Sequence, residues 1–123
     1  MRIYQSQTGI VIKVGQNDRE NDELIKTENQ DYVWCHLDNQ PSPHAVIEST
    51  EPDNVSINDA FQLVKYYSKA KKAKNVNGIY AKIRDVHRVD PKNHPGLVTL
   101  RKSPTKRSVK TNVCSLHKIG CVE

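Results

Sequence analysis

The chain of 123 residues lacks any long run of apolar residues. No stretch approaches the roughly 20 apolar residues that cross a bilayer, so we expect no membrane-spanning segment. Lys13 interrupts the apolar run Ile10-Val11-Ile12, so the N-terminus has no signal-peptide core. The three cysteines are an odd number without the pattern of a small secreted domain, which favours a reducing compartment. We therefore expect a soluble, cytoplasmic protein that does not bind membranes.

Motifs typical of enzymes and metal sites are also missing. The sequence has no glycine-rich phosphate loop, nucleophile elbow or paired-carboxylate motif, so we predict neither catalysis nor a cofactor. Cys114-x-x-His117-x-x-x-Cys121 has zinc-ligand residue types at a loosely suitable spacing, but it supplies only three ligands. A fourth ligand from His94 or His87 has no support in the spacing, so we expect no metal site.

Charge is distributed unevenly along the chain. Residues 1–60 carry 4 Lys/Arg and 11 Asp/Glu, whereas residues 61–123 carry 15 and 3. The two halves therefore have formal charges of −7 and +12 within a total of +5. A half this basic attracts nucleic-acid phosphates through counterion release. The alternative is a solvated surface balanced by the acidic half.

The first half of the chain contains short candidate strands separated by turn residues. The β-branched run over 10–14 predicts a strand, and the runs over 33–37 and 45–47, separated by a cluster of turn residues, predict two more that are antiparallel to each other. Asn17 is suited to cap a short helix over 18–26, whose acidic residues lie where the helix dipole favours them.

The longest predicted element is a helix over 57–72. Its apolar residues recur at helical spacing from Ile57, and Ser56 with Asp59 resembles a capping box. Asn77-Gly78 is expected to end it. Three lysines fall together on another face and predict an exposed lysine ridge: Lys65, Lys69 and Lys72.

The last part of the chain contains two further candidate strands. Residues 79–89 alternate apolar and polar side chains, which favours one strand with one buried face. Pro91, Pro95 and Gly96 predict a loop over 90–96, followed by a strand over 97–100. Together the elements predict an α+β fold, a small, mostly antiparallel sheet packed with one long amphipathic helix and one short helix.

A series of motifs follows the order found in one known family. The motifs are Gly15, Asn21-Asp22, Asp31-x-x-Trp34-x-His36, Pro41, His44-Ala45-Val46-Ile47, Tyr66-Tyr67-Ser68-Lys69-Ala70 and Pro91-Lys92…Pro95-Gly96. In this order they resemble the NFACT-R domain, the RNA-binding module of ribosome-quality-control factors. The resemblance covers residues 9–108. It implies a single NFACT-R-like domain over 1–110, with a basic, irregular tail over 111–123.

The resemblance also implies a function and a set of partners. It predicts a module that binds structured RNA, such as tRNA or ribosomal RNA, in ribosome-associated quality control, with the ribosomal particle as a further partner. The chain departs from the family at the turn Pro41-Ser42-Pro43 and at Cys35. The peptide-tailing activity of full-length factors is not implied, because we expect no room for their tRNA-contacting and coiled-coil regions.

The family motifs define a corner of the fold whose chemistry has more than one interpretation. Asp31, His36 and His44 are residue types found in acid–base or metal sites. We expect them instead to hydrogen-bond the chain around the turn or to contact RNA, with Trp34 in the core beneath them. The alternative for Trp34 is a base-stacking platform. The family-motif corner comprises Asn21, Asp22, Asp31, Trp34, His36 and His44.

The basic residues of the second half are the predicted phosphate contacts. Such contacts position a nucleic acid without reading its sequence. Charge alone leaves two alternatives open, a DNA-binding or sensing module and a protein-interaction adaptor that uses the acidic half. The predicted nucleic-acid-binding set comprises Lys65, Lys69, Lys72, Lys82, Arg84, Arg88, Arg101, Lys102 and Arg107, with Lys106 beside them.

Overall fold

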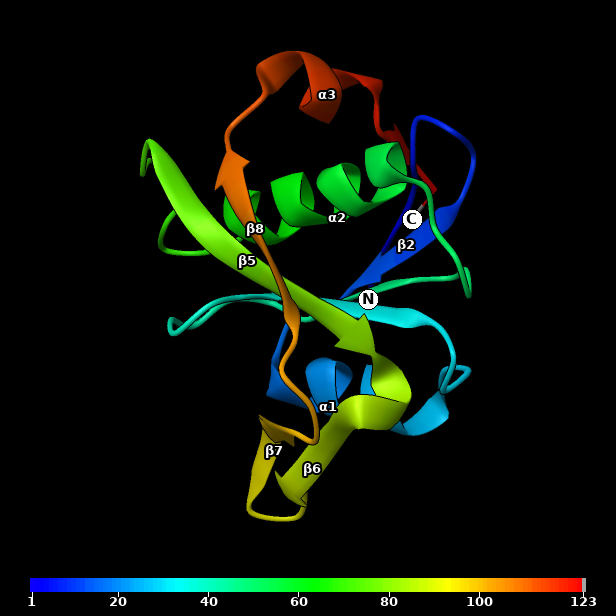
Figure 1. Cartoon of the computed structure of the whole chain (residues 1–123), viewed down its shortest axis with the longest axis vertical. Helices are drawn as coiled ribbons and strands as arrows, with labels where there is room; N and C mark the ends of the chain where they lie inside the picture. The colour runs from blue at the N-terminus through cyan, green and yellow to red at the C-terminus, as the bar shows by residue number, and fades with distance from the viewer. Residues whose placement is uncertain (123) are drawn as a thin grey trace.

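The computed structural model describes residues 1–122 and has the expected α+β architecture (Figure 1). A seven-stranded antiparallel sheet has the strand order β8-β5-β3-β4-β2-β1-β9, and β6 with β7 forms a separate hairpin. The strands of the sheet are β1 (Arg2–Gln5), β2 (Val11–Val14), β3 (Val33–Leu37), β4 (Ala45–Ile47), β5 (Asn75–Lys82), β8 (Thr105–Lys110) and β9 (Gly120–Cys121). The hairpin pairs β6 (Val86–Asp90) with β7 (His94–Leu100), and the helices are α1 (Asp18–Thr27), α2 (Asn54–Tyr66) and α3 (Val113–Lys118).

The sheet has a hydrophobic core on each face. Side chains alternate along β3, so Val33, Cys35 and Leu37 belong to the core beneath α2, whereas Trp34 belongs to the core beneath α1. Figure 1 shows α2 and α3 toward one end of the molecule and α1 with the β6–β7 hairpin toward the other. No helix among residues 1–122 is long and apolar enough to span a bilayer.

The two predicted helices are present, with one boundary difference that matters. Asn17 caps α1 as expected, because its side chain accepts a hydrogen bond from the Glu20 N–H. The second helix begins earlier than predicted, at Asn54, and ends at Tyr66 rather than residue 72. The Ser68 hydroxyl donates to the Lys65 carbonyl at 2.7 Å, an alternative to continued helix. The capping box is wrong, since Ser56 lies inside the helix and donates to Asp53.

The single strand predicted over 79–89 is two strands. A 3₁₀ turn at Ile83–Asp85 separates β5 from β6, and it places both Ile83 and Val86 in the core beneath α1. Residues 77 and 78, expected to end the helix, lie within β5. Gly78 is required there because a Cβ would overlap the Phe61 ring. The strand expected over 97–100 is present and begins earlier, within the predicted loop.

The C-terminal part of the chain is more regular than its sequence indicates. Residues 105–110 form β8, the edge strand beside β5. The irregular conformation expected over 111–123 is wrong, because this range contains helix α3 and strand β9. Helix α3 packs against α2, and β9 pairs with β1 at the edge of the sheet. Residue 123 lies outside the described residues, and the domain boundary at residue 110 stays a prediction.

Candidate nucleic-acid interface

Three aromatic side chains of the family-motif corner pack against one another. The Trp34 indole Nε1–H donates to Nδ1 of His44 at 2.9 Å. The His36 ring stacks on Trp34 with 9° between the planes, and it meets His44 edge-on with 5.0 Å between centroids. Trp34 is only 1% exposed. The core position predicted for Trp34 is confirmed, and a base-stacking role is excluded by its burial.

His44 is held neutral at the centre of this corner. Burial, with a smaller contribution from the neighbouring His36, lowers the pKa of His44 to about 3. Because Nδ1 accepts the indole hydrogen bond, the ring proton is on Nε2. Burial also lowers the pKa of His36, whose Nδ1 lies 2.6 Å from the Leu37 carbonyl. Two neutral rings, His36 stacked on the buried indole and His44 edge-on to it, support the turn and leave no charged acid–base pair.

Asn21 links the corner to α1. Its side-chain oxygen accepts a hydrogen bond from the His44 backbone N–H at 3.1 Å. Gly15 lies against the same side chain, and a Cβ at this position would overlap it. Gly96 of the hairpin has φ +85°, a conformation that favours glycine, and approaches the Asp18 carbonyl. The family motifs therefore fix the contact of α1, the β3–β4 turn and the hairpin.

The two acidic members of the corner bind arginines. Asp22 accepts two hydrogen bonds from Arg88, at 2.7 and 2.8 Å, which ties α1 to β6. Asp31 lies just before the start of β3 and forms an ion pair with Arg84, whereas His36 lies near the end of β3. The structure therefore does not bring Asp31 together with His36 and His44. No group of three or more His, Cys, Asp or Glu side chains within residues 1–122 is placed to hold a metal ion.

Lys65 contradicts the predicted lysine ridge. Its side chain is 1% exposed, and its ammonium donates to the Lys71 carbonyl at 2.9 Å and to the Thr111 hydroxyl at 2.6 Å. Burial lowers its pKa. Lys69 and Lys72 lie in the loop beyond the end of α2, so the three lysines do not share a helix face. Helical periodicity placed them together only because the helix was predicted to continue to residue 72, beyond its end at Tyr66.

Several other predicted phosphate contacts are engaged within the protein. Lys82 donates to the Asp31 and Thr50 carbonyls. Arg84 and Arg88 are paired with the aspartates described above. Arg107 donates to two asparagines of α2 and lies over the Tyr80 ring. The side chains of these four residues contact other parts of the chain, Arg84 while 57% exposed, and their role in nucleic-acid binding stays a prediction.

Seven of the exposed cations lie on or beside strand β8, at the outer edge of the sheet. Lys110 opposes Asn75, the residue that follows Lys74, so the lysine-rich loop after α2 meets the end of β8. Lys102 shares a hollow with Thr105 at the start of β8, which places the β7–β8 loop at the other end of the strand. We call this surface the basic edge, and its members are Lys71, Lys72, Lys74, Arg101, Lys102, Lys106 and Lys110, all exposed.

Three members of the basic edge, Lys71, Lys74 and Lys110, were not in the predicted set. The alternation of Lys106, Ser108 and Lys110 in the sequence is the strand pattern that could have identified Lys110, whereas Lys71 and Lys74 lie in the loop between α2 and β5. Lys106 forms an ion pair with Asp38 at 3.2 Å but is 63% exposed. The other members form no ion pair within residues 1–122. Seven cations along one edge suit a phosphate backbone.

Comparisons with known proteins agree with the motifs and the fold. A family model described as the NFACT protein RNA binding domain matches residues 1–102. The chain is 38% identical over 100 residues to the Rqc2 homolog RqcH of Bacillus subtilis, and 32% identical over 103 residues to that of Streptococcus suis. These matches cover 80% and 82% of this chain but only 17% and 18% of the relatives.

A solved structure has the same fold over nearly the whole chain. It is the C-terminal part of the fibronectin/fibrinogen-binding protein from Streptococcus suis, with a TM-score of 0.87 and 25% identity. The match covers 97% of this chain and 48% of that one, so it includes residues beyond the family model. Motifs, fold and sequence relatives agree, and the chain belongs to the NFACT protein RNA-binding domain family.

Proposed function

We propose that this protein binds structured RNA, tRNA or ribosomal RNA, through the basic edge. The observation that carries the proposal is the row of exposed cations along β8, from Lys74 and Lys110 at one end to Lys102 at the other. Strand pairing holds Lys106 and Lys110 of this row in place before binding, which lowers the ordering free energy that opposes the contact. Membership in a family of RNA-binding domains favours RNA over the other polyanions.

The position of the acidic residues indicates the side from which RNA approaches the protein. Five of the acidic residues of the first half lie in α1 or directly beside it, on an element that packs against β4 and the hairpin and not against β8. α1 packs against the hairpin and β4, on the opposite side of the fold from α2. A phosphate backbone is repelled by α1 and attracted by the basic edge, so RNA approaches from the β5–β8 side.

We propose further that binding, not catalysis, is the activity of this domain, and that it operates in ribosome-associated quality control in the cytoplasm. Support comes from the family resemblance and from the two bacterial relatives described as Rqc2 homologs. The chain spans less than a fifth of the length of these relatives. We therefore propose that the domain acts at the ribosomal particle, and that the basic edge is the surface through which it contacts RNA there.

Fluorescence anisotropy over a salt series tests the proposal. The probes are a folded tRNA, an unstructured single-stranded RNA and duplex DNA. The test variant carries Lys74→Gln, Lys102→Gln and Lys110→Gln, and a control of equal charge carries Arg19→Gln, Lys26→Gln and Lys92→Gln, which are exposed but outside the basic edge. Each lost phosphate contact lowers the salt slope by about 0.7–0.9, so the test variant loses about 2 in slope.

The outcomes separate the alternatives. Preference for tRNA, weakened by the test variant and unchanged in the control, supports the proposal. Tighter binding to duplex DNA supports the DNA-binding alternative and contradicts the RNA assignment. Equal weakening by both variants shows that net charge, and not the basic edge, determines affinity. Association with ribosomal particles that survives the test variant favours the acidic half as a protein-binding surface.

A further inference from the structure

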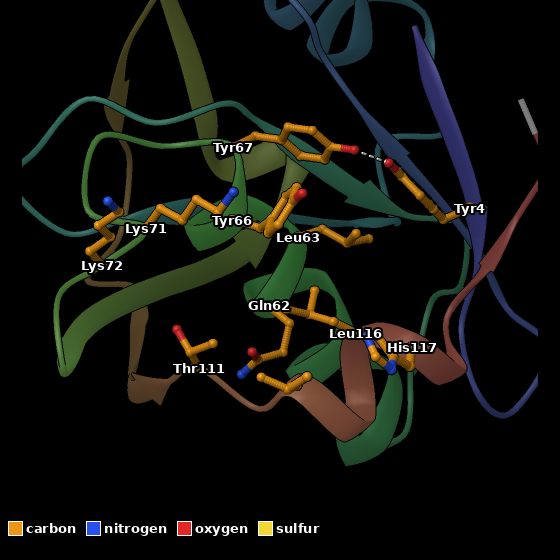
Figure 2. Close-up of a pocket in the computed structure, with 11 residues that line it drawn as sticks. Tyr4, Gln62, Leu63, Tyr66, Tyr67, Lys71, Lys72, Thr111, Leu116 and His117 are labelled. Atoms are coloured by element: carbon orange, nitrogen blue, oxygen red, sulfur yellow. Dashed lines mark hydrogen bonds between the residues drawn. The ribbon is translucent and has the colours of Figure 1, made fainter.

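A hollow of about 430 Å³ lies between α2, α3 and the loop that follows α2 (Figure 2). This volume falls within the range of sites that hold small ligands. Leu63, Val113 and Leu116 give it apolar walls, and Tyr66 adds an aromatic ring that is 40% exposed. Figure 2 shows Lys71 and Lys72 at one end and His117 at the other. The interior is therefore apolar and the rim is cationic.

The walls of the hollow are already fixed by hydrogen bonds. The Gln62 amide donates to the Lys110 carbonyl at 2.5 Å and accepts from the Asn112 N–H at 2.8 Å. The Thr111 hydroxyl accepts from the buried Lys65 ammonium, which also binds the Lys71 carbonyl. Lys65 thus holds the lysine-rich loop against the start of α3. The hollow is formed before any ligand enters, which lowers the cost of binding.

The polar groups that remain at the rim select the ligand. The Lys71 ammonium lies 4.0 Å from the centroid of the Tyr66 ring. The ammonium occupies this face of the ring, so a flat ligand that stacks there displaces it, and Lys71 and Lys72 are then both free to bind an anion attached to the ligand. A planar apolar group with an attached anion matches this arrangement, and a nucleobase with its phosphate is such a group.

The hollow is continuous with the basic edge. Lys71 and Lys72 belong to both, and Gln62 on its wall binds the backbone of Lys110. A strand of RNA that follows the basic edge therefore passes the mouth of the hollow with its phosphates already bound. We propose that this hollow takes an unpaired nucleobase of the bound RNA against Tyr66, with the adjacent phosphate held by Lys71 and Lys72. The inference rests on the proposed RNA-binding function.

The site requires an unpaired base, so it predicts a preference among RNAs. A base inside a duplex is stacked and paired and does not reach the hollow without being unstacked, which costs free energy. Stem–loop RNA should bind more tightly than a blunt duplex RNA of the same number of phosphates. This preference separates contact with a base from contact with the backbone, which both RNAs offer equally.

Anisotropy with these two RNAs tests the inference on the full chain. Tyr66→Ala should weaken stem–loop binding about tenfold and leave duplex binding unchanged, since only the stem–loop loses the stacking of a base on the ring. Tyr66→Phe keeps the ring and should retain the affinity. Val113→Trp, at a position 59% exposed, fills the hollow without a change of charge and should reproduce the loss. Circular dichroism checks that each variant is folded.

A direct probe is uridine 5′-monophosphate titrated into ¹⁵N-labelled protein. The expected result is a set of amide shifts at Tyr66, Thr111 and Leu116, absent in Val113→Trp. If wild-type protein binds both RNAs equally and Tyr66→Ala changes neither, the inference is overturned while the proposed function stands. That same result is expected if an apolar side chain of a protein partner occupies the hollow. If wild-type protein binds neither RNA, both proposals fail.

Discussion

The Trp34 indole N–H donates to Nδ1 of His44 across 2.9 Å inside the core beneath α1. This bond joins β3 to the residue that precedes β4, and His36 stacks on the indole and meets the His44 ring edge-on. The pair explains why aromatic residues and histidines gather in one short part of the sequence. They are structural partners that hold α1, the turn and the hairpin together.

Replacing His44 with Phe should destabilise the protein by about 1–3 kcal/mol, because the buried indole N–H loses its acceptor. The measurement is urea denaturation followed by Trp34 fluorescence. The matched control is His87→Phe, at an exposed position. A loss below about 0.5 kcal/mol for His44→Phe would contradict a structural role for the bond.

Stability should fall as the pH is lowered through the range where unfolded histidine binds a proton. The folded-state pKa of His44, about 3, lies below the ordinary value of 6.5. The contribution of neutral His44 is therefore fully present above pH 6.5 and is lost progressively toward pH 3. The expected slope is about 1.4 kcal/mol per pH unit below 6.5.

The measurement is urea denaturation at about pH 7 and pH 5, above the range where most carboxylates titrate. Burial lowers the pKa of the neighbouring His36 as well, so it adds to the slope in the same direction. The charge of Asp22 raises the pKa of His44, which opposes the effect of burial and reduces the slope. His44→Phe should reduce the slope. An unchanged slope in this variant would show that His44 is not the titrating group.

Lys65→Met should destabilise the protein by about 1–3 kcal/mol, because the Lys71 carbonyl and the Thr111 hydroxyl lose a buried donor. It should also weaken RNA binding, since the lysine-rich loop loses its attachment to residue 111. Lys69→Met, in the exposed part of the loop, is the control and should change stability by less than about 0.5 kcal/mol. Equal stability of the two variants would contradict the anchoring role.

Gly78→Ala should destabilise the protein by about 1–3 kcal/mol, because the new methyl group overlaps the Phe61 ring in a packed core. Gly120→Ala is the control, since a Cβ added there would lie 3.7 Å from the nearest atoms, those of Gln5. Thermal denaturation measures both. Partial recovery in the double variant Gly78→Ala, Phe61→Leu would identify the overlap as the cause. Equal midpoints for the two single variants would contradict close packing of β5 on α2.

Patterns of neighbouring residues were sufficient to predict several helices and strands from the sequence. Asn17 with its following acids predicted α1, because an N-cap and a favourable dipole are properties of adjacent residues. The β-branched run over 10–14 predicted β2, and the short runs on either side of the turn cluster at 38–41 predicted β3 and β4. The family motifs in order indicated the family that the comparisons show. Strand β8 and helix α3 carry weaker patterns, and their place in the fold depends on pairing and packing with distant residues.

The candidate interface was less predictable than the fold. Helical periodicity assigned Lys65, Lys69 and Lys72 to one exposed face, but the Ser68 hydroxyl and the Tyr4–Tyr67 contact accompany the end of the helix before Lys69. Arg84 and Arg88 looked available because their aspartate partners lie more than fifty residues away in the sequence. Whether a cation is already paired within the protein is decided by such long-range contacts.

The sequence by itself determined the family, the α+β class and the charge difference between the two halves, because these follow from residue types and their order along the chain. Only the tertiary structure decided which cations are available to a phosphate backbone. Strand pairing brings Lys74, Lys110 and Lys102 to one edge, while burial removes Lys65 from the surface. The physical reason is that an ammonium group binds either a protein carbonyl or a ligand, and the fold determines which of them lies within reach.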